Sequence, residues 1–427
     1  MSALAICLKR SGMIVCGSDR AASAEMLKRL AANGIAVFPI HKAENLGDAQ
    51  VVVYSDGISE ENAELRAARL SGRLVLSRTD LLKIIAGNFR HVVTVAGSHG
   101  KTTATSMLAH CLGSCGAEFS AYIGGWDRTF GNFYSSGKNF FVTESCEYKK
   151  NLLRLNGETA VLLNVDKDHM DCYHSFSELR ECFYTYAERA QTAVLCADDP
   201  YISEALCCHR LHGITYGLEN ADYVAYDLVQ NEGRYSFQVS EQGTPLCAVR
   251  LRIPGRSNVY NALSAVAVMR RYGFCAEDVA NGLEAFQGVE RRFEKIGERN
   301  GAAWVADYAH HPKEIESALE TAKSLCKGEL YVLFEPHTYS RTATLLYEFA
   351  ESLSSVQNLA ILPVYAAREY YAGKGDASDL VQLLPQSEYI ETDEELRNFL
   401  ARAGEGDMCL FLGAGSIYGR AKRELSL

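Results

Sequence analysis

The stretch from His91 to Leu112, HVVTVAGSHGKTTATSMLAHCL, determines how the rest of the chain is interpreted. Its β-branched first residues predict a buried strand, and Gly97 and Gly100 predict a tight turn whose backbone N–H groups point inward. Lys101 would then open a helix, and the N-terminus of a helix favours a bound anion. The stretch therefore predicts a phosphate-binding loop between a strand and a helix.

Phosphate binding needs these residue types close together. The ammonium group of Lys101 can reach the β- and γ-phosphates of a nucleotide, and the hydroxyl of Thr102 can bind a Mg²⁺ ion that bridges them. In the usual pattern, G-x-x-x-x-G-K-[ST], the first glycine lies further from the lysine than Gly97 lies from Lys101, so this loop is shorter. On the motif alone, a tight turn with an incidental Lys-Thr pair stays open as the alternative.

The composition indicates a globular protein with more than one domain. A chain of 427 residues is longer than a single core usually supports, so we expect two or three domains. The net charge of −10, without any block of Lys and Arg, argues against a nucleic-acid-binding surface. No apolar run approaches the ~20 residues of a membrane span. Fourteen cysteines without a signal peptide indicate a reducing compartment, so we expect a soluble, cytoplasmic protein. The cluster Cys207-Cys208-His209 with His212 lacks a CxxC pair, and we expect no zinc there.

Helix and strand patterns alternate along most of the chain, which predicts an α/β fold with parallel sheets. A first helix precedes a short strand that ends at 17–19. Further strands are expected at 35–38, 51–54, 140–143, 160–165, 193–196, 304–306, 330–334, 359–362 and 408–412, with helices near 21–33 and 313–326. Residues 217–249 alternate and contain turn residues, which favours an antiparallel hairpin or edge. Breaks near 86–91 and 288–290 predict three domains, 1–88, 89–288 and 289–427.

Two polar clusters follow predicted strands, where open α/β sheets place their ligands. The first, Thr143-Glu144-Ser145-Cys146-Glu147, offers carboxylates for Mg²⁺, although a solvated surface is an equal alternative. The second runs from Asn164 to Asp171, NVDKDHMD, and contains His169. Its imidazole can ligate a divalent ion or orient a phosphate oxygen, and the neighbouring carboxylates can fix its tautomer. The second cluster is the more specific one, because it follows a phosphate loop.

A third cluster, PGRSNVYNAL at 254–263, is a turn that enters an alanine-rich helix. Asn258 and Asn261 lie three residues apart and share a helix face, where their amides could bind the edge of a purine. A structural role for Asn258 as a helix cap is the alternative.

Together these motifs resemble the signature series of the Mur ligases. The matching runs, in the family's order, are Gly97-x-His99-Gly100-Lys101-Thr102, Asn164-x3-Asp168-His169-x-Asp171, Gly255-x2-Asn258-x2-Asn261, Arg291-Arg292-Phe293-Glu294 and Asp307-Tyr308-Ala309-His310-His311-Pro312. The runs GVERRFE (288–294), FEPHTYSRT (334–342) and VYAARE (364–369) are most similar to the branch that adds L-alanine. The resemblance covers essentially the whole chain.

The resemblance implies a fold of three domains: a small Rossmann-like domain for a UDP-linked substrate, a central domain like that of P-loop ATPases, and a C-terminal Rossmann-like domain. It also implies site residues. Those on the ATP side are Gly97, Ser98, His99, Gly100, Lys101, Thr102, Thr103, Asn261, Arg292 and Asp307. Those on Mg²⁺ are Thr102, His169 and either Glu144 or Glu147, and those on the substrates are Ser18, Asp19, Tyr308, His310 and Arg341. Lys101, His169, His310 and Arg341 would be catalytic, and Arg292 and Asp307 would act when the third domain closes.

The implied activity is an ATP-dependent ligase that joins L-alanine to the carboxylate of UDP-N-acetylmuramate for peptidoglycan synthesis. The carboxylate would attack the γ-phosphate, and the amine of alanine would then displace phosphate from the acyl phosphate. Such catalysis is mostly positioning and charge neutralisation. The helix 175–190 contains no lysine that could be carbamylated as in some relatives. The alternatives are a ligase that recycles a tripeptide onto the same acceptor, a folylpolyglutamate synthetase, and a nucleotide-binding partner without turnover.

The sequence departs from the family at its start. Relatives begin with a strand and a GIGGxGM turn that binds the UDP diphosphate, and Met1 coincides with the last methionine of that turn. We therefore expect Met1 to be an internal start codon; the alternative is a chain that lacks part of its UDP-binding loop. A second departure is Glu147-Tyr148-Lys149, which replaces a more acidic Glu-Ser-Asp run and leaves the choice between Glu144 and Glu147 open.

Overall fold

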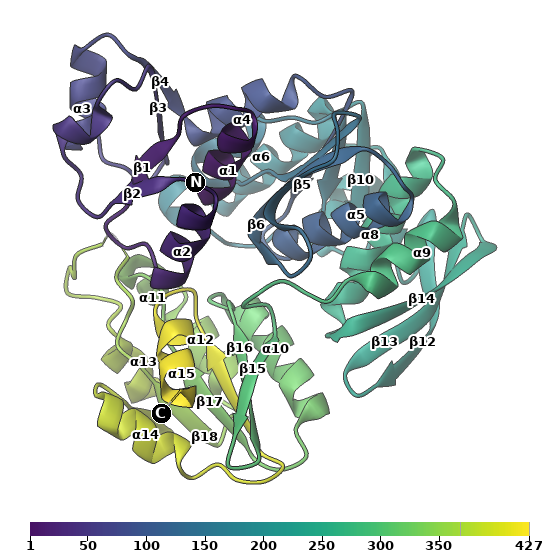
Figure 1. Ribbon diagram of the computed structural model, residues 1–427. Helices are drawn as coiled ribbons and strands as arrows, with labels where there is room; N and C mark the ends of the chain where they lie inside the picture. Colours follow the sequence, from purple (N-terminus) through teal and green to yellow (C-terminus); the bar gives the residue numbers. More distant parts are fainter. Residues whose placement is uncertain (368, 427) are drawn as a thin grey trace. The chain divides into compact units, whose positions relative to one another are not determined.

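The computed structural model describes residues 1–367 and 369–426, and these form two compact units (Figure 1). The first unit contains Met1–Lys167, Cys172–Tyr216 and Ser264–Gly282. The second contains Asp168–Asp171, Gly217–Leu263 and Leu283–Leu427. The predicted boundary near 288 lies close to the division after Gly282, whereas the predicted second domain, 89–288, is divided between the two units.

The first unit begins with alternating helices and short strands. These are α1 (Ser2–Arg10), β1 (Cys16–Ser18), α2 (Ala24–Ala32), β2 (Ala36–Phe38), the 3₁₀ helix η1 (Ala43–Leu46), β3 (Val51–Tyr54), α3 (Ala63–Leu70), β4 (Leu74–Ser77) and α4 (Arg78–Ala86). Strand β1 pairs in parallel with β2, and β3 pairs in parallel with β4. The apolar face of α1 packs with Leu81 and Leu82 of α4 and with Phe133 and Phe141 of the sheet that follows. This shared core joins the first 88 residues to the rest of the unit.

The main sheet of the first unit is largely parallel. Its strands are β5 (His91–Ala96), β6 (Phe119–Asp127), β7 (Gly131–Ser135), β8 (Phe140–Glu144), β9 (Thr159–Leu162), β10 (Thr192–Cys196) and β11 (Ile214–Gly217), in the spatial order β11-β10-β9-β5-β8-β6-β7. Only β7 is antiparallel to its neighbour. All four residues of β9 are buried, as expected for a strand covered on both faces. The carboxyl ends of β5, β8 and β9 therefore meet at one edge of the sheet.

The first unit also contains helices α5 (Lys101–Ser114), α6 (Phe176–Arg189), α7 (Pro200–Cys207) and most of α9 (Ala276–Ala285), together with the 3₁₀ helix η2 (Tyr148–Leu153). Helix α8 (Ser257–Arg271) spans the boundary between the units. Helix α5 is buried from Thr102 to Leu112. The phosphate loop leads directly into this helix, so the burial of α5 holds the end of the loop in place.

The second unit contains an antiparallel ribbon and a second α/β sheet. The ribbon is β12 (Tyr223–Asn231), β13 (Arg234–Glu241) and β14 (Thr244–Pro254), which confirms the antiparallel structure predicted for 217–249. Its first turn contains Glu232 and Gly233, with φ of 46° and 67°, a pair typical of tight hairpins. The short 3₁₀ helix η3 (Met170–Cys172) begins in this unit.

The C-terminal sheet has the order β15-β16-β20-β17-β18-β19. Its strands are β15 (Glu294–Arg299), β16 (Ala302–Asp307), β17 (Leu330–Phe334), β18 (Asn358–Ile361), β19 (Ser387–Tyr389) and β20 (Met408–Leu412), and β15 is antiparallel to β16. Helices α10 (Pro312–Leu325), α11 (Tyr339–Thr344), α12 (Leu346–Leu353), α13 (Ala377–Leu383), α14 (Asp393–Leu400) and α15 (Ile417–Leu425) complete this part.

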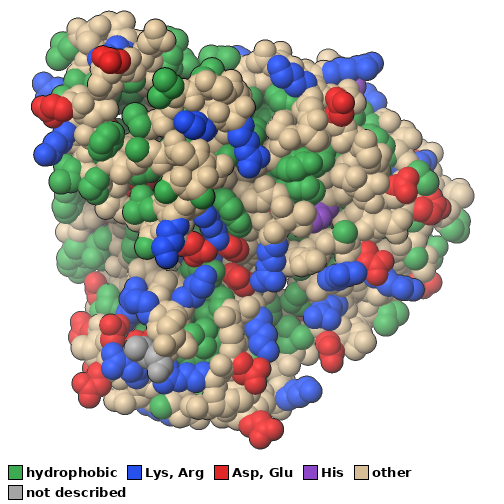
Figure 2. All heavy atoms as spheres, viewed as in Figure 1, with side chains coloured by type: hydrophobic (Ala, Val, Ile, Leu, Met, Phe, Trp, Pro, Cys, Tyr) green, Lys and Arg blue, Asp and Glu red, His purple; other side chains and the backbone are tan. Residues whose placement is uncertain are grey.

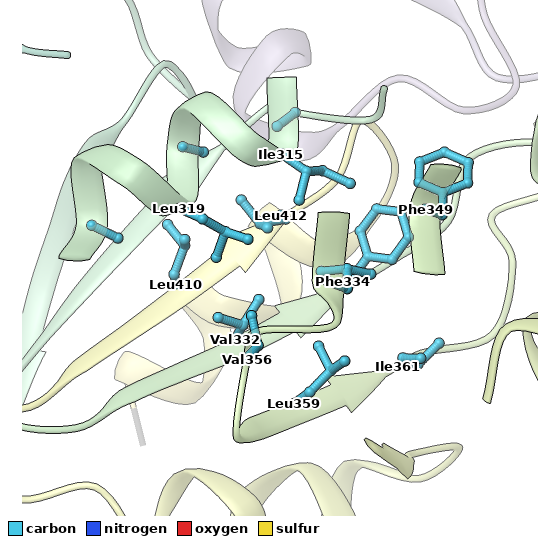
Figure 3. Packing of buried hydrophobic residues seen from close by; sticks show 14 of the residues in the cluster. Ile315, Leu319, Val332, Phe334, Phe349, Val356, Leu359, Ile361, Leu410 and Leu412 are labelled. Carbon is cyan, nitrogen blue, oxygen red and sulfur yellow. The ribbon is translucent and has the colours of Figure 1, made fainter. Parts of the chain in front are cut away.

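Two hydrophobic clusters cover the two faces of the C-terminal sheet. Val332 and Phe334 of β17 point to the side of α10 and α12, and Figure 3 shows Phe334 beside Phe349 there, with ring centroids 5.3 Å apart. Leu333, between them in sequence, belongs to the cluster with α14 and α15. Successive residues of a strand alternate between faces, so this sheet is a central layer between two layers of helices (Figure 1).

The surface charges are mixed on the face shown in Figure 2, and the cysteines are not paired in disulfides. Figure 2 shows Lys and Arg side chains interspersed with Asp and Glu side chains over one face. All fourteen cysteines are free thiols. Within the described residues, we find no helix with the length and apolar character that crossing a bilayer requires.

Candidate active site

The predicted phosphate loop lies between β5 and α5. Gly97 has φ of 141° and Gly100 has φ of 82°, both in the region that favours glycine. A Cβ at Gly97 would lie 3.0 Å from Leu163 Cβ and 3.2 Å from the backbone nitrogen of Asn164. The first glycine is thus needed for close packing against the segment after β9, and the second turns the chain into α5.

The segment after β9 holds the phosphate loop by hydrogen bonds. Asn164 accepts from the backbone N–H of His99 at 2.8 Å and donates to its carbonyl oxygen at 3.1 Å. The backbone N–H of Asp166 donates to Ser98 Oγ at 2.8 Å, and Asp166 Oδ2 lies 3.1 Å from His99 Nε2. Asn164 and Asp166 lie in a motif that the sequence singled out, but their contacts with the loop were not predicted.

Lys101 lies in this loop with four oxygen atoms around its ammonium group. Its Nζ donates to the carbonyl oxygens of Gly97 at 2.5 Å and Ser98 at 3.1 Å, and to the two carboxylate oxygens of Glu147 at 3.0 and 3.1 Å. Glu147 is fully buried, and the Tyr173 hydroxyl donates to its backbone carbonyl at 2.5 Å. Thus a buried carboxylate faces the lysine at the head of α5.

The other residues predicted near Mg²⁺ have different surroundings. Thr102 and Thr103 are buried in the first turn of α5. Glu144, at the end of β8, accepts from the backbone N–H of Gly124 at 2.6 Å. His169 belongs to the second unit, where its Nε2 lies 3.7 Å from Asp168 Oδ2. In the first unit, therefore, Glu147 rather than Glu144 lies at Lys101.

Ser18 and Asp19, predicted to bind substrate, lie at the end of β1. The Ser18 hydroxyl donates to Glu64 at 2.5 Å and lies 3.0 Å from His41 Nδ1, while Asp19 accepts from the backbone N–H of Ala21 at 2.8 Å. Against the effect of burial, hydrogen bonds from Ser18, Asn45 and His41 lower the pKa of Glu64. His41 and Glu64 complete a polar cluster that no sequence motif indicated.

In the second unit, Arg341 contacts a carboxylate and a histidine, and a second histidine lies beside the first. Its Nη2 donates to Asp168 Oδ1 at 2.8 Å, and its Nη1 lies 3.1 Å from His337 Nδ1. The rings of His337 and His310 are 5.8 Å apart, and His310 Nδ1 lies 2.8 Å from the carbonyl oxygen of Tyr308, to which it can donate.

Electrostatics keep these groups in defined charge states. Burial lowers the pKa of His310 to about 4, and burial with the neighbouring His310 and Arg341 lowers that of His337 to about 3. Against burial, His169, Arg341 and His310 hold the pKa of Asp168 well below its usual range. At neutral pH the cluster therefore contains two neutral imidazoles and a charged Asp168–Arg341 pair.

Asp307 and Arg292 lie in the same unit. Asp307 accepts from the backbone N–H groups of Phe293 and Ala309, each at 2.7 Å, and burial raises its pKa to about 6 although Arg292 opposes this. The Arg292 guanidinium lies 5.1 Å from the centre of the Tyr308 ring, a cation–π contact.

Asn258 and Asn261 do share one face of α8. Asn261 donates to Asn258 Oδ1 at 3.1 Å, and Asn258 donates to the carbonyl oxygen of Pro254 at 2.7 Å. The Asn258 side chain thus donates to the backbone just before α8 instead of accepting from an N–H group as a helix cap, and its oxygen accepts from Asn261.

A phosphate loop on a parallel sheet, with a lysine, a buried carboxylate and a fixed glycine turn, is the site of a nucleotide-binding protein. The chain belongs to the Mur ligase family. Family models match it in three consecutive parts: the Mur ligase family catalytic domain at residues 1–90, the Mur ligase middle domain at 95–269, and the Mur ligase glutamate ligase domain at 291–415. The resemblance inferred from the motifs is confirmed.

Named relatives cover nearly the whole chain. It is 35% identical to a UDP-N-acetylmuramate--L-alanine ligase of Caldicellulosiruptor bescii, over 98% of this chain and 94% of the relative. It is 36% identical to a ligase of the same name from Caldanaerobacter subterraneus subsp. tengcongensis, over 98% and 93%. The crystal structure of the UDP-N-acetylmuramate-alanine ligase of Thermotoga maritima superposes with a TM-score of 0.86 at 26% identity, covering 100% of this chain and 96% of the other. The predicted three-domain Mur ligase fold is confirmed.

Proposed function

We propose that this protein is an ATP-dependent ligase that joins L-alanine to the carboxylate of UDP-N-acetylmuramate in peptidoglycan precursor synthesis. The observation that carries the proposal is near-full-length similarity to ligases of that name, combined with Lys101 set in a glycine-bracketed loop. The small molecules ATP, L-alanine and the UDP-linked sugar acid are its proposed substrates.

The reaction has two balanced steps. An oxygen of the muramoyl carboxylate attacks the γ-phosphorus of ATP, and ADP leaves with the electrons of the broken P–O bond. The amine of L-alanine then attacks the acyl carbon, and inorganic phosphate leaves as the amide forms. No enzyme nucleophile is required, so the residues contribute positioning and charge neutralisation.

On the ATP side we assign Lys101 to the β- and γ-phosphates, with the N–H groups of Gly97–Gly100 and the head of α5 around them. Lys101 donates to carbonyl and carboxylate oxygens in this structure, and phosphate oxygens can replace these acceptors when ATP binds. Asn261 is assigned to the adenine, and Arg292 and Asp307 to the phosphates and ribose.

Magnesium fits the donor set of the first unit. Glu147 is a fully buried carboxylate at the phosphate loop, where Lys101 is its cation. Carboxylate oxygen atoms are ligands that Mg²⁺ prefers. We propose that Glu147 and Thr102 of the first unit hold the ion; the family pattern adds His169 and allows Glu144 as the other carboxylate. When bound, Mg²⁺ neutralises charge on the phosphates.

On the amino-acid side we assign Tyr308, His310 and Arg341. With its Nδ1 donating to a backbone carbonyl, neutral His310 keeps Nε2 as an acceptor for a proton from the amine. Arg341 is oriented by Asp168 and can bind a carboxylate.

Oxygen labelling tests the proposed chemistry. With ¹⁸O in the muramoyl carboxylate, one labelled oxygen should appear in the released phosphate, and mass spectrometry should detect the L-alanyl amide. Unlabelled phosphate formed with the amide would exclude an acyl phosphate.

A further inference from the structure

Two consecutive lysines just after Glu147 have a left-handed backbone. Lys149 has φ 52° and ψ 31°, and Lys150 has φ 58° and ψ 25°; we call these two residues the lysine turn. Residues with a Cβ rarely adopt this conformation, and successive ones do so less still. Such a conformation persists only where the surrounding structure enforces it, and it is common at functional sites.

Asp56, which follows β3, holds both sides of the lysine turn. Its backbone carbonyl accepts from Lys149 Nζ at 2.7 Å, and its carboxylate accepts from Asn151 Nδ2 at 2.9 Å. The Asn151 side chain is buried, so its bond is shielded from water. The backbone N–H of Lys150 donates to the carbonyl oxygen of Glu147 at 2.8 Å. The turn therefore links Asp56 to Glu147 through a few short contacts.

Glu147 in turn binds Lys101 through both carboxylate oxygens. We propose that Asp56 is a positioning residue: it holds the lysine turn, and thereby fixes the Glu147 carboxylate beside the phosphate loop for binding of ATP with Mg²⁺. The inference rests on the role proposed for Lys101 and Glu147 in ATP binding. If Asp56 has this role, the first 88 residues, which include Ser18, help to position a residue at the phosphate loop.

A nearby contact provides the matched control. Arg154 and Asp80 form an ion pair that also joins the first 88 residues to the segment after Glu147, but both side chains are exposed and neither bonds to the lysine turn. If Asp56 only connected the first 88 residues to the segment after Glu147, losing the Asp56–Asn151 bond or the Asp80–Arg154 ion pair would change ATP affinity equally.

The test measures ATP affinity by calorimetry, with and without Mg²⁺. We expect Asp56→Ala to weaken binding with Mg²⁺ about fivefold and binding in EDTA much less, because Glu147 is the displaced group. Asn151→Ala should have the same effect, and the double variant should be no worse than either single one. Asp56→Asn keeps an acceptor for Asn151 and should bind like the wild type, as should Arg154→Ala.

A glycine at the lysine turn tests whether Asp56 acts on ATP affinity by holding the left-handed backbone or only by stabilising the fold. Glycine adopts the left-handed conformation without strain, so Lys150→Gly should reduce the effect of Asp56→Ala on affinity to less than twofold. Unchanged affinity in Asp56→Ala and Asn151→Ala, or an equal loss with and without Lys150→Gly, would overturn the proposal, as would a wild-type protein that does not bind ATP. If the wild type binds ATP but does not ligate L-alanine, the proposed function fails while the binding series still decides the role of Asp56.

Discussion

At the scale of single residues, Lys101 contributes both to the stability of the fold, through its pair with Glu147, and to the proposed binding of ATP. Its side chain is only partly buried, and four oxygen atoms surround its ammonium group, two of them from the buried carboxylate of Glu147. Removing one partner of a buried pair leaves the other charge uncompensated, which is costlier than removing both.

We expect Lys101→Ala to abolish turnover, by at least about a hundredfold, while the circular dichroism spectrum stays that of the wild type. Its melting temperature should fall because Glu147 loses its cation. The double variant Lys101→Ala/Glu147→Gln should melt higher than Lys101→Ala yet remain inactive. Activity in either variant would contradict the role given to Lys101.

The histidines of the second unit make stability depend on pH. Since the folded pKa values of His310 and His337 are about 4 and about 3, the unfolded chain binds a proton on each below pH 6.5 and the folded chain does not. Stability is then lost as the pH falls from 6.5, by about 1.4 kcal/mol per pH unit for each group. Asp307 opposes this between about pH 4 and 6, because its raised pKa lets the folded chain bind a proton first.

We therefore expect thermal stability to fall between pH 6.5 and 4.5, and to fall less in His337→Gln, which removes one of the groups that titrate only on unfolding. Melting curves at several pH values measure this. Parallel pH profiles for the wild type and His337→Gln would show that His337 is charged in the folded protein.

The sequence predicted residues at this scale where a short motif carries them, but not the partners that the fold supplies. Gly97, Gly100 and Lys101 follow from local spacing and were found in the predicted turn. Asn164 reaches His99 across 65 positions, and Ser18 meets Glu64 across 46. Such pairs depend on strand order, which local patterns do not specify.

At the scale of elements, the phosphate loop depends on the packing of α5. Gly282 of α9 lies against it, and a Cβ at that position would come within 2.6 Å of Cys111 Cα. Cys111 Cα is a backbone atom of α5, and Gly282 lies in the backbone of α9, so neither helix can move aside easily. The glycine thus allows two helices to approach closely beneath the site.

We expect Gly282→Ala to destabilise the protein by about 1–3 kcal/mol and to weaken ATP binding through α5. Gly419→Ala is the control. Gly419 also lies in a helix, but a Cβ there would meet only Arg423 Nη1, at 4.0 Å, so the higher helix propensity of alanine should leave stability equal or greater. Denaturation and calorimetry measure both. If Gly282→Ala changed neither the free energy of unfolding nor ATP affinity, the close packing of α9 against α5 would be contradicted.

Elements with continuous apolar runs were predicted well. Strand β17 was found at the predicted residues, and β8, β9 and α10 differ at their ends by no more than a few residues. The hairpin β6–β7 and the edge strand β15 were not predicted. Their sequences include glycines and charged residues, and their pairing is supplied by neighbours distant in the chain, so local periodicity is weak.

At the scale of the whole molecule, the two units carry the two groups of residues to which we assign different parts of the proposed reaction. The first has the phosphate loop, and the second has the neutral histidines, Arg341 and Asp307. The overall fold followed from the order of motifs rather than from any one of them. The division at Gly282 and within α8 could not be predicted, because it reflects contacts and not composition.

The central claim is that ATP cleavage depends on UDP-N-acetylmuramate and L-alanine together. The most direct measurement is phosphate release with ATP, Mg²⁺ and UDP-N-acetylmuramate, comparing L-alanine, other amino acids and the L-alanyl-γ-D-glutamyl-meso-diaminopimelate tripeptide. We expect release with L-alanine, none with the tripeptide, and none without the sugar acid. Release with the tripeptide but not with L-alanine, or no release with any acceptor, would contradict the account.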